Sequence, residues 1–372
     1  MLHLVPGETG GSELYARRLV PALLEAEDAP ELTVLASSQA LVSLSAEPWA
    51  ELVDLVGLPF DARSRFRRVL AEQTLLPRAL ARRNVELLHN LFTTAPARPG
   101  VPQVSTILDV IYKRIPEAHE GLLGHGLSAL VLVSAKRSRR VITISEAAKS
   151  DIVRFLGVPA ERVDVTYLGP ALGGDGERSE GEVRAELRLG DGPIVLSVSA
   201  KRPHKNLERL FTAFARVRFD PAPVLVVPGY STWHEESLQE LAKSVGIPDR
   251  VVFAGWLSDD VLDGLYRAAT CLVFPSLAEG FGLPVLDALA RGTPVTCSNT
   301  SSLPEVAGDA ALYFDPTDID DIRVAIERLL GDAALRARLA AAGRAQAQKF
   351  SWAHTAERTL ESYERVLATA RS

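Results

Sequence analysis

Two acidic residues, Glu279 and Asp287, stand eight positions apart and enclose the run Gly-Phe-Gly-Leu-Pro-Val-Leu. Pro284 suits the first turn of an α-helix and Gly292 suits its end, so the pattern predicts a helix that starts near Gly282. A helix start presents unpaired backbone amides and the positive end of the helix dipole, which together favour a bound anion such as a diphosphate. One acid on the loop and one in the helix can then face the same ligand. The alternative is a tight turn at a helix start with an incidental acid.

A second charged motif, Arg202-Pro-His-Lys205-Asn206, follows an apolar run that ends near Ser199. Two cations three positions apart at the end of a strand can converge on one anionic group. The alternative is a solvated basic turn before a helix that begins around Leu207. Beside the first motif, the anion-binding interpretation is favoured.

A glycine-rich loop, Gly7-Glu-Thr-Gly10-Gly11-Ser12-Glu13, lies between the first apolar run and the first helical pattern. Its spacing differs from the Gly-x-Gly-x-x-Gly loop of dinucleotide-binding folds. Gly10 and Gly11 either let the backbone approach a ligand or form an ordinary turn in which Ser12 caps the helix.

The segment Thr106-Ile-Leu-Asp109 ends another apolar run and offers a carboxylate at a strand end. Asp109 is a candidate either for orienting a substrate or for holding its own loop. His89 and His204 could supply an imidazole, although a single histidine is more often structural.

Apolar runs alternate with helical patterns in both halves of the chain, which predicts parallel sheets covered by helices on both faces. The sequence therefore indicates an α/β protein with two doubly wound domains. Ligands of such folds bind beyond the carboxyl ends of the strands, here in an expected cleft between the halves. A polar, Gly-rich stretch over residues 173–181 is the best linker candidate. The predicted strands are residues 2–5, 32–36, 86–89, 103–107, 141–144 and 163–167 in the first half, and 194–198, 224–227, 251–253, 271–274 and 295–297 in the second.

The tail over residues 317–371 is rich in Ala, Leu, Arg and Glu, and it predicts helices with breaks near Gly331, Gly343 and Ser351. Asp318-Ile-Asp320 has the spacing of a metal-binding Asp-x-Asp motif, but its position favours acids in the first turn of a helix. We therefore expect no metal site.

Composition limits the class of protein. The chain has 372 residues, 47% of them hydrophobic, and is long enough for two domain cores. A net charge of −6 argues against broad nucleic-acid binding. Cys271 and Cys297 lie in apolar runs and are expected to be buried free thiols. Because no apolar stretch reaches ~18 residues and no signal segment is evident, we expect a cytoplasmic protein.

One basic stretch raises the question of membrane binding. Residues 63–83 carry seven arginines among apolar side chains such as Phe66, Val69 and Leu70. A helix of this kind either rests on an anionic membrane surface, at the inner face of the cell membrane, or is a solvated face paired with nearby acids.

The run from Glu279 to Asp287 resembles the acid-x7-acid motif of glycosyltransferase family 4, whose members are retaining enzymes of GT-B architecture with two facing Rossmann-like domains. The resemblance extends over essentially the whole chain and is most specific in the C-terminal half. It implies an acceptor-binding domain over residues 1–170, with a C-terminal helix over residues 352–372 packed back on it. A donor-binding domain would span residues 171–351.

The resemblance also implies roles for single residues. Glu279 would hold the transferred sugar, while Arg202 and Lys205 would neutralise the donor pyrophosphate. Asp287, where the family has Glu, would hold the ribose. Leu108 stands where the family commonly has His, which leaves Asp109 as a second catalytic candidate. Further implied contacts are Gly11, Leu257, Phe281, Gly282 and Leu283 for the donor, Gly10 and His89 for the acceptor, and Glu305 for the ribose or a helix cap.

The implied activity is transfer of a hexosyl group from GDP-mannose, dTDP-rhamnose or a UDP-sugar to a glycan, lipid-linked or natural-product acceptor, without a metal or other cofactor. The Gly10–Glu13 loop and Pro116-Glu-Ala-His119 look most like bacterial mannosyl- or rhamnosyl-type transferases. Two alternatives stay open. One is a sugar-nucleotide epimerase of similar architecture, and the other is a protein that binds sugar nucleotides or glycans without turnover. The oligomeric state is also open.

Overall fold

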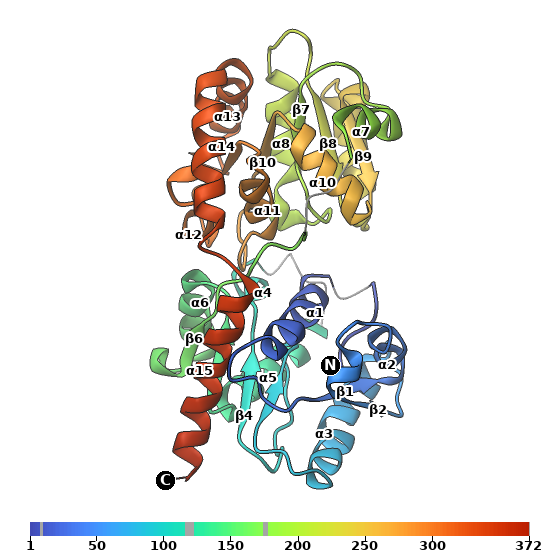
Figure 1. Ribbon diagram of the computed structural model, residues 1–372. Helices are drawn as coiled ribbons and strands as arrows, with labels where there is room; N and C mark the ends of the chain where they lie inside the picture. The colour runs from blue at the N-terminus through green and yellow to red at the C-terminus, as the bar shows by residue number, and fades with distance from the viewer. Residues whose placement is uncertain (8–9, 116–122, 174–177, 372) are drawn as a thin grey trace. The chain divides into compact units, whose positions relative to one another are not determined.

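The chain forms two compact units in a computed structural model that describes residues 1–7, 10–115, 123–173 and 178–371 (Figure 1). Unit 1 holds Met1–Lys113, His119–Gly169 and Ser351–Ser372, and unit 2 holds Arg114–Ala118 and Pro170–Phe350. Three sequence features lie wholly or partly outside the described residues: the motif over residues 116–119, positions 8–9 of the glycine-rich loop, and positions 174–177 of the linker candidate.

Unit 1 contains two separate parallel sheets. Strands β1 (Thr33–Ser37) and β2 (Asp54–Leu58) pair with each other, and the other sheet has the order β3-β4-β5-β6. Its strands are β3 (Leu88–Asn90), β4 (Gln103–Thr106), β5 (Arg140–Thr143) and β6 (Val163–Val165). Parallel pairing requires crossover connections, which helices largely supply. The helices of this unit are α1 (Gly11–Leu24), α2 (Ser38–Leu44), α3 (Arg65–Ala81), α4 (Ile111–Arg114), α5 (Leu123–Arg137), α6 (Glu146–Leu156) and α15 (Trp352–Arg371).

The first predicted strand is wrong. Residues 2–5 form no strand, and the Leu4 amide instead donates to the Met1 carbonyl (3.5 Å). Leu4 is nevertheless fully buried, so the apolar pattern correctly indicated burial but not strand pairing. Strand β2 was not predicted, because four of its five residues are exposed or half-buried and the run contains Asp54 and Gly57.

The C-terminal helix α15 packs on unit 1. The Thr355 hydroxyl donates to the carbonyl of Tyr167 (2.6 Å). A Cβ atom added at Gly169 would lie only 2.6 Å from the backbone nitrogen of Trp352. The chain after β6 therefore approaches the start of α15 so closely that only glycine fits at position 169.

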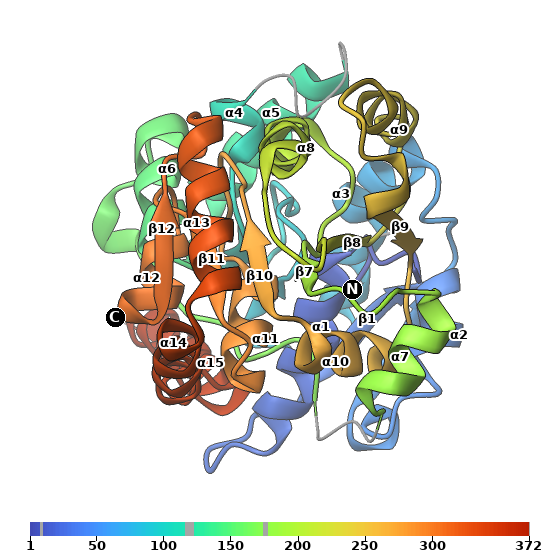
Figure 2. The ribbon, with the colours of Figure 1, turned by 90° about the horizontal axis from the view of Figure 1, so that it is seen from above.

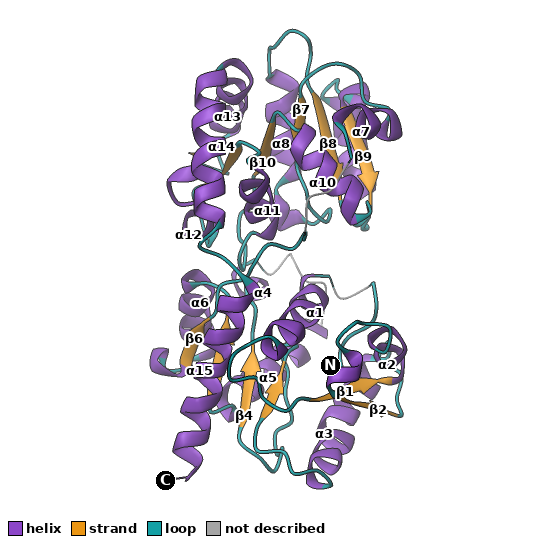
Figure 3. Ribbon diagram, viewed as in Figure 1, coloured by secondary structure: helices purple, strands orange, loops and turns teal. Residues whose placement is uncertain are grey.

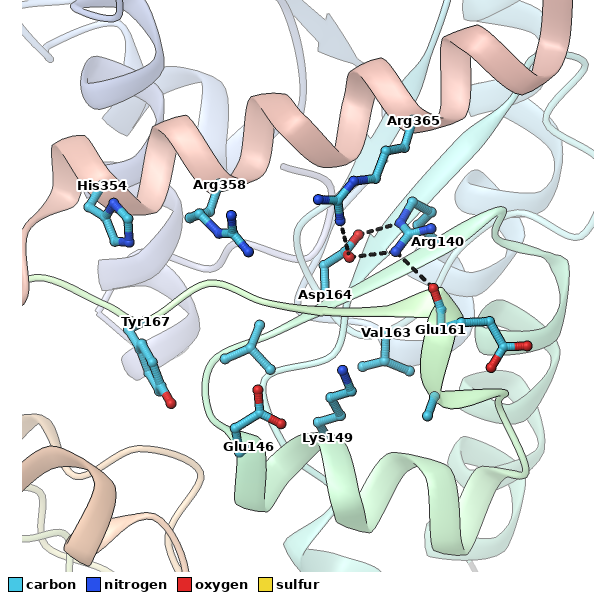
Figure 4. A pocket seen from close by; sticks show the side chains of 12 residues that line it. Arg140, Glu146, Lys149, Glu161, Val163, Asp164, Tyr167, His354, Arg358 and Arg365 are labelled. Atoms are coloured by element: carbon cyan, nitrogen blue, oxygen red, sulfur yellow. Dashed lines mark hydrogen bonds and ion pairs between the residues drawn. The ribbon is translucent and has the colours of Figure 1, made fainter.

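Further along α15, an ionic network ties the helix to β6. Asp164 binds Arg140, the Ser362 hydroxyl (2.7 Å) and Arg365 (2.8 Å), and Figure 4 shows the two arginines converging on this carboxylate. Although burial opposes ionisation, these hydrogen bonds and charges hold the pKa of the Asp164 carboxyl below its ordinary value. A cavity of about 490 Å³ opens beside the network, and among the described residues none of the predicted site residues lines it.

Unit 2 is built around one six-stranded parallel sheet in the order β12-β11-β10-β7-β8-β9, which Figure 2 shows from above. Strands β7 (Ile194–Leu196) and β10 (Cys271–Phe274) are completely buried, which explains their uninterrupted apolar sequences. The other strands are β8 (Val224–Pro228), β9 (Val251–Gly255), β11 (Val295–Ser298) and β12 (Ala311–Phe314).

Helices alternate with the strands of unit 2 and cover the sheet, as Figure 3 shows. A large apolar core joins the sheet to helices such as α8 and α13, with Phe211, Phe214 and Ile326 fully buried. The helices are α7 (Glu180–Leu187), α8 (Leu207–Arg216), α9 (Glu235–Ser244), α10 (Asp259–Ala268), α11 (Leu283–Arg291), α12 (Leu303–Ala307), α13 (Ile319–Gly331) and α14 (Ala333–Ala347).

The predicted class of fold, α/β with parallel sheets in both halves, is confirmed, and β12 is an additional strand. The helix-start interpretation of Asp318 is also confirmed, because its side chain accepts from the amides of Asp320 (2.8 Å) and Asp321 (3.2 Å) at the start of α13. The predicted break at Gly343 is wrong. Helix α14 continues through Gly343, where a Cβ atom would come within 3.1 Å of Leu289 on α11.

Two further expectations concern burial and membranes. Both cysteines, Cys271 and Cys297, are buried free thiols, as predicted. Within the described ranges, none of the helices combines the length and the low polarity that crossing a bilayer requires.

Candidate functional site

Three neighbouring strands of unit 2 bring the two charged motifs together. β10 pairs with β7 on one side and with β11 on the other, all parallel, so their carboxyl ends lie along one edge of the sheet. The loop after β7 carries Arg202 and Lys205, and the loop after β10 carries Glu279. The amide of Leu277 donates to the carbonyl of His204 (2.8 Å), which ties these two loops directly.

An ion pair between Lys205 and Glu279 forms the centre of the candidate site. Lys205 Nζ lies 2.6 Å from Glu279 Oε1, and the two side chains are 16% and 10% exposed. The same Nζ lies 5.5 Å from the centre of the Phe274 ring. Removing either charge would leave the other poorly solvated and unpaired, so the two groups depend on each other.

Helix α11 begins where the sequence predicts. Gly282 caps it with φ 105°, a left-handed conformation that favours glycine, and a Cβ atom there would lie 2.7 Å from Leu303 Cδ2. Pro284 stands in the first turn, and Gly292 ends the helix with φ 70°. The positive end of the helix dipole therefore follows Glu279 by only three residues, which favours an anionic ligand near the ion pair.

The other predicted donor-side residues differ in accessibility. Arg202 is exposed, and Leu257 and Leu283 are half-buried. Phe281 is only 3% exposed, and its ring packs edge-on against Phe350 with centroids 5.8 Å apart. The Phe281 side chain is therefore a core residue, and a ligand contact at this position would use its backbone.

Asp287 is buried, and its carboxylate holds the first residues of unit 2. Oδ1 accepts hydrogen bonds from the amides of Ala171 (2.9 Å) and Leu172 (3.2 Å). Arg291 lies 3.7 Å from the same oxygen and donates to Asp263 (2.6 Å). These contacts give Asp287 a structural role in unit 2, and its implied ribose contact stays a prediction.

In unit 1, the glycines and Asp109 stand at helix starts. Gly10 caps α1 with φ 53° and ψ −129°, a conformation that favours glycine, whereas Gly11 is an ordinary helical residue with nothing within 4 Å of a built Cβ. Asp109 accepts a hydrogen bond from the amide of Ile111 (3.1 Å) at the start of α4. This bond is the one expected if Asp109 holds its own loop, which was one of the two roles considered for it.

His89 is held through both of its ring nitrogens. Nδ1 lies 2.7 Å from the Tyr363 hydroxyl, and Nε2 lies 2.7 Å from Thr106 Oγ1. Burial lowers the pKa of His89 to about 3, so the imidazole is neutral at physiological pH. The ring therefore links β3, β4 and α15, which favours the structural interpretation over acceptor binding.

Three residues in or next to the loops of the ion pair have no role in the sequence-based predictions: Lys201, Asn206 and Ser301. Lys201 is fully buried and donates to the carbonyls of Val227 (3.1 Å) and Gly229 (2.6 Å), and burial lowers its pKa to about 8. Nothing in the sequence separates such a lysine from a surface one. Asn206 has a left-handed backbone, with φ 58°. Its residue type was a usable indication of this conformation, because asparagine adopts it more readily than most residues.

Within the described residues, no group of three or more His, Cys, Asp or Glu side chains is arranged to hold a metal ion.

The sequence matches known glycosyltransferases over both units. The family described as glycosyl transferases group 1 matches residues 179–346, and the one described as glycosyltransferase family 4 matches residues 9–170. The O-antigen chain mannosyltransferase B of Escherichia coli is 33% identical over 271 residues, which are 70% of this chain and 70% of that one. The serotype-specific mannosyltransferase WbdA of Escherichia coli is 34% identical over 253 residues, 64% of this chain but only 30% of WbdA.

The fold is also shared with solved structures. The sucrose-phosphate synthase from Thermosynechococcus elongatus superposes with a TM-score of 0.75 at 21% identity, over 97% of this chain and 94% of the synthase. This similarity confirms the predicted GT-B class of fold. Fold and sequence together define an enzyme that transfers sugars. The chain belongs to glycosyltransferase family 4.

Replacing Asp287 with alanine should destabilise unit 2. The amides of Ala171 and Leu172 would lose their acceptor and Arg291 would lose a carboxylate neighbour, so we expect a loss of about 2–4 kcal/mol in the free energy of unfolding at neutral pH. Chemical denaturation measures this loss. The exposed loop residue Asp191 provides a matched control, and Asp191→Ala should stay within about 0.5 kcal/mol of the parent. Equal stability of the two variants would contradict the structural role of Asp287.

Proposed function

We propose that this chain is a retaining mannosyltransferase that moves mannose from GDP-mannose to a hydroxyl group of a glycan or lipid-linked acceptor. The observation that carries the proposal is the Lys205–Glu279 ion pair, placed at the strand ends just before the start of α11. The named relatives that are mannosyltransferases support the choice of sugar. GDP-mannose is thereby preferred over the other two classes of donor that the sequence leaves open.

The charges at the site suit the bond that must break. As the anomeric carbon separates from the diphosphate oxygen, negative charge grows on the oxygen and positive charge grows on the sugar. Lys205, the exposed Arg202 and the first turn of α11 offer positive charge to the leaving diphosphate. The Glu279 carboxylate can accept hydrogen bonds from sugar hydroxyls and orient the ring. Because Lys205, Glu279 and the start of α11 are held in place before the donor binds, these groups need little reorganisation during the reaction.

Retention of configuration and independence of metal are part of this proposal. The cations and the helix start would supply the positive charge that a metal ion provides in other transferases. A covalent intermediate would require a side chain that attacks the sugar as a nucleophile, and the proposal gives this role to none of the site residues. We therefore propose that the acceptor hydroxyl attacks from the face on which the diphosphate leaves.

The donor and the chemistry can be tested together. In a panel of GDP-mannose, dTDP-rhamnose and UDP-glucose, GDP-mannose should raise the melting temperature most. With an added oligosaccharide or lipid-linked acceptor it should release GDP and form an α-mannoside at the same rate with and without EDTA. A rearranged sugar formed from the donor alone would indicate the epimerase instead, and tight binding of a donor that stays intact would indicate a binding protein. Loss of transfer in EDTA would contradict independence of metal.

We also propose that unit 1 makes peripheral contact with anionic membranes through α3. Phe66 and Leu70 stand four positions apart on this helix and are 77% and 51% exposed. Arg65 and Arg67, on either side of Phe66, are exposed as well. Apolar side chains with flanking arginines on a surface helix suit the interface of a bilayer that carries negative charge. This contact would bring the enzyme to a lipid-linked acceptor.

Vesicle flotation tests the membrane contact. The protein should float with vesicles that contain anionic lipid and stay behind with purely zwitterionic vesicles. The double variant Phe66→Ser, Leu70→Ser should lose most of the flotation, while Val324→Ser on α13 of unit 2, another exposed apolar position, should not. If anionic vesicles recover none of the parent protein, the membrane proposal fails.

A further inference from the structure

Two residues beside the ion pair adopt a backbone conformation that is unusual for side chains other than glycine. Asn206 has φ 58° and Ser301 has φ 60°, and only Thr93 and Arg188 share this feature among the described residues. The left-handed conformation costs energy for any residue with a Cβ atom. It persists where the surrounding structure fixes it, and such positions concentrate at functional sites.

Ser301 holds both main-chain polar groups of Glu279. Its Oγ accepts a hydrogen bond from the Glu279 amide (3.0 Å) and donates to the Glu279 carbonyl (2.6 Å). The next residue, Ser302, is fully buried, and its hydroxyl reaches the Phe281 carbonyl (2.8 Å) and the Glu279 carbonyl (3.1 Å). The loop after β11 therefore fixes the backbone from which the Glu279 side chain extends.

Asn206 fixes the loop that carries Lys205, the other partner of the ion pair. It directly follows Lys205 and is 2% exposed. Its Nδ2 donates to the carbonyls of Pro275 (3.0 Å) and Pro316 (2.8 Å), and its Oδ1 accepts from Arg209 (2.9 Å). Pro275 begins the loop that leads to Glu279, so the Lys205 loop is bound to the Glu279 loop at its base.

We propose that Ser301 and Asn206 are positioning residues that hold Glu279 and Lys205 in register for catalysis. The inference rests on the proposed function, in which these two charges act on the donor. A side chain that both receives and donates a hydrogen bond can fix the orientation of a whole residue, because the amide and the carbonyl of Glu279 are then both anchored. The strained backbone at Ser301 allows its hydroxyl to reach both groups at once. Strain is thus retained at a position where it serves alignment.

Two substitutions at Ser301 separate alignment from stability. Ser301→Gly removes the hydroxyl but suits the left-handed backbone, so relief of strain should offset part of the cost of the two lost hydrogen bonds and keep the melting temperature close to that of the parent. Its kcat should nevertheless fall by at least ~10-fold with donor affinity nearly unchanged, because misplaced catalytic groups lose rate rather than binding. Ser301→Thr retains the hydroxyl but is β-branched in a left-handed conformation. It should melt at a lower temperature and keep most of the turnover that the glycine variant loses.

A second measurement does not depend on turnover. In Ser301→Gly, hydrogen exchange of the Glu279 amide should be at least ~10-fold faster, while the amides of the buried strand β10 keep their protection. Asn206→Gly, which also suits its backbone, should likewise lower kcat with donor affinity nearly unchanged. If no donor is turned over by the parent protein, the proposed function fails, and the exchange result still decides whether Ser301 anchors Glu279. Parent-like kcat in Ser301→Gly, or an unchanged exchange rate of the Glu279 amide, would overturn the inference.

Discussion

The ion pair between Lys205 and Glu279 is the interaction on which the candidate functional site of unit 2 depends. Each charge is largely removed from water, so each requires the other and a fixed backbone on both sides. The sheet provides this arrangement, because β7 and β10 are hydrogen-bonded neighbours whose carboxyl ends place the two loops side by side. In the proposed function, a diphosphate that entered this site would meet positive charge already in place. A sugar attached to that diphosphate would meet a carboxylate whose position is set in advance.

Helix α11 connects this site to the rest of unit 2. Its first turn follows the Glu279 loop, its middle holds the chain at Ala171 and Leu172 through Asp287, and Arg291 in its last turn binds Asp263. At its end, Arg344 donates to the carbonyl of Arg291 (3.5 Å). These contacts fix where the first turn of α11, with the positive end of its dipole, lies relative to the ion pair.

The sequence was most informative where one residue type has one physical use. Gly282, Pro284 and Gly292 have few roles besides starting and ending a helix, and α11 has the predicted bounds. Apolar runs were less informative, because burial and strand pairing need the same side chains. Leu2, Leu4 and Val5 are therefore buried without forming a strand, and the half-exposed strand β2 was missed.

Interactions between residues distant in sequence could not be predicted. Asp287 contacts backbone amides more than a hundred positions away, and Ser301 binds the main chain of Glu279 from the next strand connection. A serine before a helix ordinarily predicts a cap, and only the fold reveals that its hydroxyl serves another loop. The position of the Phe281 ring in the core could not be predicted either, because it depends on packing against Phe350, which is distant in sequence.

The most direct test of this site is the initial rate of sugar transfer by Lys205→Met, Glu279→Gln and the double variant. These substitutions remove the charges and keep the approximate shapes of the side chains. Because both groups would act on the same breaking bond, each single variant should lose at least ~100-fold in kcat. The double variant should lose far less than the product of the two single losses. Transfer at nearly the parent rate by either single variant, in a protein that melts like the parent, would contradict the assignment of this ion pair as the catalytic centre.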